Sequence, residues 1–213
     1  MLDEAFVLLG TPVSWLEVLA FALALACVAC GIREVHWAWP LTLASSLLYA
    51  WLFVASRLYG EATLQGFFAL IALWGWWQWL RPNARSSTEG GLRISSLARP
   101  GMFALALGWL AGWLLLGVAL QAFTDTDVPF LDAFPTAGSV LGQLMLGRKV
   151  LQNWQVWIIV NLASVGLFAF KGLWLTALLY AVFAAMAWVG LRQWRSRFDA
   201  PSDGTPPPAA ATA

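Results

Sequence analysis

Charged residues, histidine and cysteine are all scarce in this chain of 213 residues. Only 11% of the residues are charged, whereas soluble domains usually carry about 25%. His36 is the single histidine, which excludes a metal site built from several histidines. The sequence also lacks Gly-x-Ser-x-Gly and Walker A motifs. We therefore expect a protein that is not an enzyme and that needs no metal or other cofactor.

The two cysteines, Cys27 and Cys30, form a Cys-x-x-Cys pair inside an apolar stretch. This spacing occurs in redox and metal sites, but the chain has no second cysteine pair to complete a zinc site. We interpret both as small apolar residues of a membrane helix. The formal net charge is only +1, so net charge gives no reason to expect a nucleic-acid partner.

Apolar residues make up 61% of the chain, and the mean hydropathy is +0.72. A single soluble core could not bury so much apolar surface, so lipid must surround most of it. A helix needs about 20 mostly apolar residues to cross the hydrocarbon layer, and it satisfies its own backbone polar groups there. Seven segments qualify: 14–32, 37–56, 61–80, 101–122, 129–147, 152–170 and 173–191.

Basic residues are distributed unevenly between the loops that join these segments. Ten arginines and lysines fall on one side, whereas only Arg57 and Lys171 fall on the other. Because cytoplasmic loops carry the excess of basic residues, we predict an N-terminus outside and a C-terminus in the cytoplasm. The predicted location is the bacterial inner membrane, with several passes through the bilayer.

The chain also contains an internal repeat. When it is shifted by 115 residues, 33–79 aligns with 148–194 without a gap, and 15 of the 47 pairs are identical. Internal repeats often indicate transporters that bind substrate between the two copies. The span 101–122 has no counterpart and inverts the chain, so both copies run in the same direction. The sequence predicts an all-α membrane protein with a 3+1+3 arrangement: a first repeat at 14–80, a loop and linker helix at 81–128, a second repeat at 129–194, and a disordered cytoplasmic tail at 199–213.

Asn161 is the most informative polar residue, because it lies in the middle of a predicted span. A buried amide is costly there unless it finds a partner or lines a wet cavity. It either contacts a substrate or hydrogen-bonds another helix, and its repeat counterpart Ser46 is the candidate partner. Trp154 and Trp157 share its helical face. Trp154 also suits an interfacial belt, because it lies near the cytoplasmic end.

Other candidate substrate contacts lie in the second, third and seventh spans. Trp74 and Gln78 are four residues apart on one helical face. Gln65 aligns with Tyr180 in the repeat, and Tyr49 lies within the second span. Each of these side chains either lines a cavity or bonds a neighbouring helix.

Two stretches are specific enough to indicate a family. They are Trp74-Gly75-Trp76-Trp77-Gln78-Trp79, and Asn153-Trp154 followed by Trp157 and Asn161. With weaker matches such as Trp39-Pro40 and Lys171-Gly172, they resemble the PnuC family of bacterial vitamin transporters. That family is similar in architecture to the SWEET sugar transporters. The resemblance covers nearly the whole chain except its termini and the 81–100 loop.

The resemblance implies transport of nicotinamide riboside by facilitated diffusion, with a cytoplasmic vitamin kinase that traps the substrate by phosphorylation. Relatives in the family carry thiamine or riboflavin, and the sequence does not choose among the three. The implied substrate contacts are Trp157, Asn161, Trp74, Gln78, Trp154, Gln65, Tyr49 and Tyr180. A non-transporting membrane scaffold is the alternative from another functional class, and the sequence is compatible with a homo-oligomer.

Overall fold

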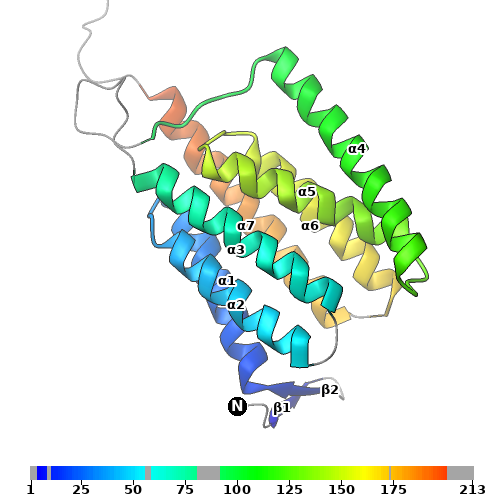
Figure 1. Ribbon diagram of the computed structural model, residues 1–213. Coiled ribbons are helices and arrows are strands. Elements are labelled where there is room, and N and C mark those ends of the chain that lie inside the picture. Colours follow the sequence, from blue (N-terminus) through cyan, green and yellow to red (C-terminus); the bar gives the residue numbers. More distant parts are fainter. Residues whose placement is uncertain (1–3, 9–10, 56–58, 81–91, 173, 201–213) are drawn as a thin grey trace, which may run out of the picture.

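The structure is a computed structural model that describes residues 4–8, 11–55, 59–80, 92–172 and 174–200. These residues form seven helices and one short hairpin (Figure 1). The helices are α1 (Trp15–Ile32), α2 (Ala38–Ala55), α3 (Tyr59–Leu80), α4 (Arg99–Phe123), α5 (Pro129–Gly147), α6 (Asn153–Phe170) and α7 (Trp174–Asp199). All seven predicted spans therefore correspond to helices, which confirms the predicted fold class.

The sequence did not predict the antiparallel hairpin of β1 (Glu4–Leu8) and β2 (Thr11–Ser14). The first strand has consecutive apolar residues, Phe6 to Leu8, rather than the alternation that indicates a half-buried strand. α7 also continues past the predicted boundary at 191, as far as Asp199. The predicted disordered tail lies outside the described residues from position 201 onward.

Six of the helices form a closed ring. α1 packs on α2, α2 on α3, α3 on α5, α5 on α6, α6 on α7, and α7 returns to α1. The first repeat therefore meets the second along two seams, α3 with α5 and α7 with α1. α4 lies outside the ring against α5 (Figure 1). This is the 3+1+3 arrangement that the repeat predicted.

α4 is fixed to α5 by two indoles. Trp109 Nε1 donates to the carbonyl of Phe134 at 3.0 Å, and Trp113 Nε1 donates to that of Phe130 at 2.7 Å. The rings of Trp109 and Phe134 also stack, with 5.0 Å between their centroids. This contact defines the outward side of α5.

Among the described residues, three helices are long and apolar enough to cross a membrane by composition alone: Arg99–Phe123, Asn153–Phe170 and Thr176–Asp199. α5 is not one of them because Asp132, Thr136, Ser139 and Gln143 lower its hydropathy. A helix in a ring can carry such residues where they face the other helices rather than lipid.

The two repeats end their first helices with the same turn. Val35 N donates to Cys30 O and Glu34 N to Gly31 O, while Val150 N and Lys149 N make the corresponding bonds in the second repeat. This pattern is a Schellman motif, which places the residue after the helix in the left-handed region. Glu34 has φ 59° and Lys149 has φ 50°, although non-glycine residues rarely adopt such angles. We call the end of the ring that carries these turns the basic end, since Arg33 and Arg148 lie there too.

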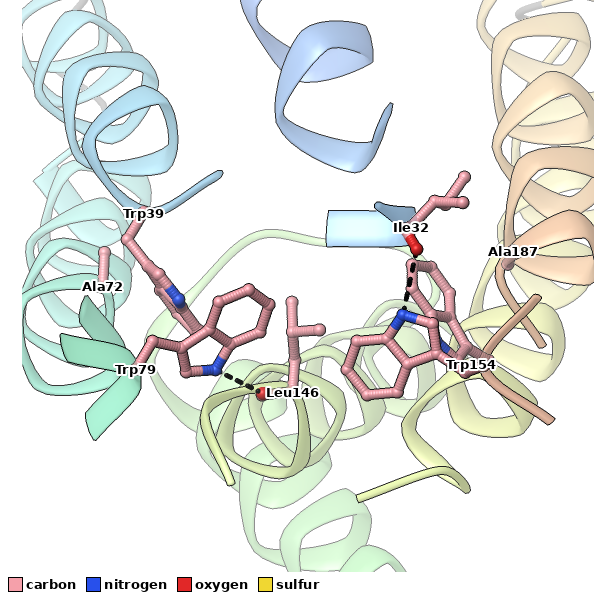
Figure 2. Packing of buried hydrophobic residues seen from close by; sticks show 8 residues of the cluster. Ile32, Trp39, Ala72, Trp79, Leu146, Trp154 and Ala187 are labelled. Atoms are coloured by element: carbon pink, nitrogen blue, oxygen red, sulfur yellow. Dashed lines mark hydrogen bonds between the residues drawn. The ribbon is translucent and has the colours of Figure 1, made fainter. Parts of the chain in front are cut away.

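The core at the basic end is built from four tryptophans in two equivalent pairs. Trp39 meets Trp79 edge-on with centroids 5.5 Å apart, and Trp154 meets Trp194 in the same way at 5.5 Å. One tryptophan of each pair also donates a hydrogen bond to a backbone carbonyl of the other repeat. Trp79 Nε1 donates to Leu146 O at 3.2 Å, and Trp194 Nε1 donates to Gly31 O at the same distance. Figure 2 shows Trp39 and Trp79 on one side of this cluster, Trp154 on the other, and Leu146 between them.

A short segment covers the turn between α5 and α6 at the same end. Ser95 N donates to Lys149 O at 2.9 Å, and Leu151 N donates to Ser95 O at 2.8 Å. Gln152 Oε1 accepts from Leu97 N. Leu92 and Ile94, in the described part of the loop before α4, pack against the tryptophan core.

Candidate substrate-binding site

Three side chains on one face of α6 form the centre of the candidate site. Trp157, Asn161 and Ser164 recur at helical spacing, so they share one face of α6. Asn161 is 5% exposed and Ser164 3%. In the described part of the chain, the structure records no hydrogen bond to the side-chain amide of Asn161. A buried amide of this kind is stabilised only when water or a ligand supplies its bonds.

Ser46 on α2 is buried to the same extent as its repeat counterpart Asn161. No hydrogen bond is recorded between the two side chains, both of which are described. Ser46, the hydrogen-bond partner that the sequence suggested for Asn161, therefore does not hydrogen-bond to the Asn161 amide.

Trp157 occupies space that a glycine provides. A Cβ at Gly142 of α5 would lie 3.0 Å from Cε2 of Trp157. The same two positions in the first repeat hold Cys27 and Thr42, whose Sγ and Oγ1 atoms are 2.7 Å apart. The second repeat thus has an indole ring packed on a glycine where the first repeat has a contact between two small polar side chains. A half-buried indole face can stack on a planar ring.

Trp154 is a core residue. It is 3% exposed, meets Trp194 edge-on, and fills the space over Gly190, where a Cβ would lie 2.6 Å from its ring. Its indole nitrogen is buried without a partner among the described residues. These contacts place Trp154 deeper in the packing between α6 and α7 than an interfacial belt would require.

Trp74 lies at the seam between α3 and α5. Its ring contacts Gly147, and the guanidinium carbon of Arg148 is 5.6 Å from the ring centroid. Gly147 is five residues along α5 from Gly142, which contacts Trp157, and this corresponds to ~7.5 Å of helix rise. Trp74 therefore lies nearer the basic end than Trp157 does. Gln78, one turn further along α3, is half-buried.

The remaining three candidates are half-buried on separate helices: Tyr49 on α2, Gln65 on α3 and Tyr180 on α7. Tyr180 stacks on Phe168 of α6 with a centroid distance of 5.1 Å, so one face of its ring is already covered. Tyr49 occupies the repeat position of Ser164, and Gln65 that of Tyr180.

Two sets of paired charged side chains lie at opposite ends of the ring. Glu34 accepts hydrogen bonds from Lys149 Nζ at 2.8 Å and from Arg197 at 2.7 Å. Burial alone would raise the pKa of Glu34, but the two cationic partners outweigh it and lower the pKa below its ordinary value. At the opposite end, Lys171 pairs with Asp132 at 2.7 Å. Among the side chains that the structure describes, the interior between these pairs offers neutral hydrogen-bonding groups and aromatic faces.

Comparison with known proteins agrees with this arrangement. A family model described as "Nicotinamide mononucleotide transporter" matches residues 14–196. The chain belongs to this family.

Two curated relatives cover almost the same length. The chain is 29% identical over 202 residues to the riboflavin/roseoflavin transporter RibM of Streptomyces davaonensis, covering 92% of this chain and 93% of RibM. It is 25% identical over 213 residues to the nicotinamide riboside transporter PnuC of Escherichia coli, covering 87% of each. A solved structure, the crystal structure of the vitamin B3 transporter PnuC, matches with a TM-score of 0.69 at 21% identity. The match covers 85% of this chain and 81% of the chain in that crystal structure.

These matches confirm the PnuC resemblance, and with it a helical vitamin transporter of the membrane; the relatives that match are transporters. They leave the substrate and the residues that bind it as proposals. Three polar residues of α5 were not among the predicted substrate contacts: Thr136, Ser139 and Gln143. Their spacing of three and four residues was visible in the sequence.

Proposed function

We propose that this PnuC-family protein carries nicotinamide riboside across the bacterial inner membrane by facilitated diffusion, and that a cytoplasmic kinase traps the vitamin by phosphorylation. The basic end faces the cytoplasm in this proposal, because basic residues concentrate on cytoplasmic loops. The substrate ring stacks on Trp157, and Asn161 hydrogen-bonds its polar substituent.

One observation carries most of the proposal: a buried amide without a recorded partner lies one helical turn from an indole, inside a ring of helices. An aromatic face attracts a cationic ring by about 0.5–2 kcal/mol, and the pyridinium of nicotinamide riboside is such a ring. Trp74, Gln78, Gln65, Tyr49, Tyr180 and Trp154 are proposed as supporting contacts.

The position of the carboxylates favours a uniporter. In the described helices, Glu17, Glu61 and Asp132 all lie in the first turn, and Asp199 is the last residue of α7. Proton-coupled carriers usually place an ionisable group at bilayer depth. We therefore expect transport that needs no ion gradient.

Riboflavin is the second candidate substrate. The observation that favours it is the identity to the riboflavin/roseoflavin transporter, which at 29% exceeds the 25% identity to the Escherichia coli nicotinamide riboside transporter. Riboflavin also presents a planar ring with polar edges to an indole.

Uptake into proteoliposomes tests these proposals. We expect saturable uptake of labelled nicotinamide riboside that continues without proton or sodium gradients and drops at least tenfold in Asn161→Ala. Gln155→Ala, on an exposed position of the same helix, is the matched control and should transport normally. Uptake that collapses without an ion gradient would exclude the uniport mechanism. Full transport by Asn161→Ala would remove Asn161 from the site, and saturable riboflavin uptake alone would favour the second candidate.

A further inference from the structure

The interior face of α5 carries a row of hydrogen-bonding side chains. Thr136, Ser139 and Gln143 follow one another at intervals of three and four residues, so they share one face of the helix. We call them the α5 polar row. Ala137 of α5 faces Gly112 of α4, and the polar row lies on the opposite side of α5. Because α4 is outside the ring, the polar row faces the ring interior.

The row lies beside the proposed aromatic contact. Gly142, adjacent to Gln143, is the residue against which Trp157 packs. Gln143 is 7% exposed, and no hydrogen bond to its side-chain amide is recorded in the described part of the chain. Like Asn161, it therefore has unused donors and acceptors in a buried position, which need water or a ligand.

The two hydroxyls of the row are oriented to accept hydrogen bonds. Thr136 Oγ1 donates to Asp132 O at 2.8 Å, and Ser139 Oγ donates to Pro135 O at 2.8 Å. Each hydroxyl proton is thus donated to a carbonyl of the same helix, and the lone pairs of the hydroxyl oxygen stay available as acceptors. With the amide of Gln143, the row offers several acceptors and two N–H donors along about two turns of helix.

Helix packing does not require this polarity. The positions 115 residues earlier, on α1, are Phe21, Ala24 and Val28. The register holds because the turns at the ends of α1 and α5 make equivalent hydrogen bonds. The same structural position is therefore apolar in the first repeat and polar in the second, which is also the repeat that carries the indole of Trp157.

We propose that the α5 polar row is a subsite for the polyhydroxyl part of the substrate. A ribose or a ribityl chain is a series of hydroxyls that donate to such acceptors and accept from an amide, while the attached planar ring lies on Trp157. The inference rests on the proposed function and narrows it. The substrate class is a nitrogen heteroaromatic ring that carries a polyol, as in nicotinamide riboside and riboflavin. Thiamine, which has a single hydroxyl, falls outside this class.

The experiment compares matched ligands with and without the polyol. Nicotinamide riboside is paired with 1-methylnicotinamide, and riboflavin with lumiflavin. Binding is measured on the purified full-length protein for wild type, Gln143→Val and Gln155→Val. The first variant installs the residue found at the equivalent position of α1, and the second changes an exposed glutamine. Ser139→Ala, which likewise installs the α1 residue, is a smaller change that keeps the test available if Gln143→Val does not fold.

We expect Gln143→Val to weaken binding of the polyol-bearing member of a pair about tenfold, since an unmet buried hydrogen bond has a cost of this order. Binding of the ring-only member should change less than twofold, and Gln155→Val should resemble wild type. Equal weakening of both members, or no weakening, would overturn the subsite. Tight binding of thiamine would overturn the substrate class. If wild type binds neither vitamin, the proposed function itself fails.

Discussion

The two repeats are alike at the basic end and different in the middle of the ring. At the basic end, equivalent turns, equivalent tryptophan pairs and equivalent indole hydrogen bonds recur after 115 residues. About one to two helical turns further in, the pair Cys27 and Thr42 corresponds to Gly142 and Trp157, and Ser46 corresponds to Asn161. A duplicated scaffold has to satisfy the same packing twice, whereas a ligand without two-fold symmetry needs different groups on its two sides. The difference therefore separates residues that hold the ring together from residues that select the substrate.

The Glu34–Lys149 pair shows that the two repeats can also differ in charge at the symmetric end. The two residues occupy the same position in the two repeats and have the same unusual backbone conformation. Identical charges there would repel one another, but opposite charges form a hydrogen-bonded pair at 2.8 Å. Lys149 Nζ also lies 4.7 Å from the ring centroid of Trp79. The pair joins the repeats at the point where they meet.

The largest expected effect comes from disturbing the symmetric end. In Gly190→Val, the new side chain would collide with the Trp154 ring, because even a Cβ would lie 2.6 Å from it. Overpacking of this kind costs about 1–3 kcal/mol or more, and we expect an apparent Tm roughly 5–10 °C lower or no folded protein. Thermal unfolding in detergent measures this. Gly166→Ala, where no atom lies within 4 Å of the new Cβ, is the control. A stable Gly190→Val would show that the tryptophan pairs are not tightly packed.

The second prediction changes the middle of the ring to match the other repeat. Trp157→Thr should reduce uptake of the vitamin at least tenfold, because the stacking face is lost. It should also lower stability by ~3 kcal/mol through the cavity that it leaves. Gly142→Cys combined with Trp157→Thr recreates the contact seen between Cys27 and Thr42, so we expect part of the stability to return without the uptake. Recovery of both would assign Trp157 to packing alone.

Much of the fold followed from the sequence because hydrophobic length and the repeat are strong patterns. The seven spans, the inverting helix α4 and the relation between the repeats were all predicted, and α1 and α5 ended within one residue of the predicted positions. The hairpin at Glu4–Ser14 was not predicted, since two short strands carry too little alternation. The length of α7 was underestimated because Arg192, Arg195 and Arg197 end the apolar run but not the helix.

The candidate site was harder to predict because facing directions within a bundle depend on contacts. Helical spacing alone does not distinguish tryptophans that the structure separates: Trp154 is enclosed by Gly190 and Trp194, whereas Trp157 keeps partial exposure. Gln143 was not predicted, because a polar residue on an otherwise apolar helix can face either a neighbour or the interior. Only the packing of α4 shows that the polar face of α5 is turned inward.

The third prediction concerns Glu34, where the repeats differ in charge. Its pKa in the folded protein is lower than its ordinary value of 4.5, because burial is outweighed by the hydrogen bonds from Lys149 and Arg197. A carboxylate with a lowered pKa stabilises the fold above its ordinary pKa, and this contribution is lost as the pH falls through the folded value. We therefore expect wild type to lose apparent Tm between about pH 5 and pH 3.

Glu34→Gln is the matched variant for this test. It should be less stable than wild type at pH 7, by about 1–3 kcal/mol for charge-assisted hydrogen bonds in a partly buried position, and should lose less stability than wild type on acidification. Parallel pH curves for the two proteins would show that Glu34 contributes nothing. Lys149→Gln offers a second check, because it breaks the pair from the other side.

The smallest expected effect lies at the opposite end, where Asp132 pairs with Lys171. Lys171 and Asp132 lie 2.7 Å apart, and their side chains are 34% and 25% exposed, compared with 12% and 18% for Lys149 and Glu34. Water and salt screen an exposed pair, and such pairs contribute about 0–1 kcal/mol. Asp132→Asn keeps an oxygen for the hydrogen bond from Thr126. We expect stability and vitamin uptake within twofold of wild type, with any difference disappearing at high salt. A large loss of uptake in Asp132→Asn would mean that the acid attracts a cationic substrate to the entrance, and the functional asymmetry between the repeats would then extend beyond the middle of the ring.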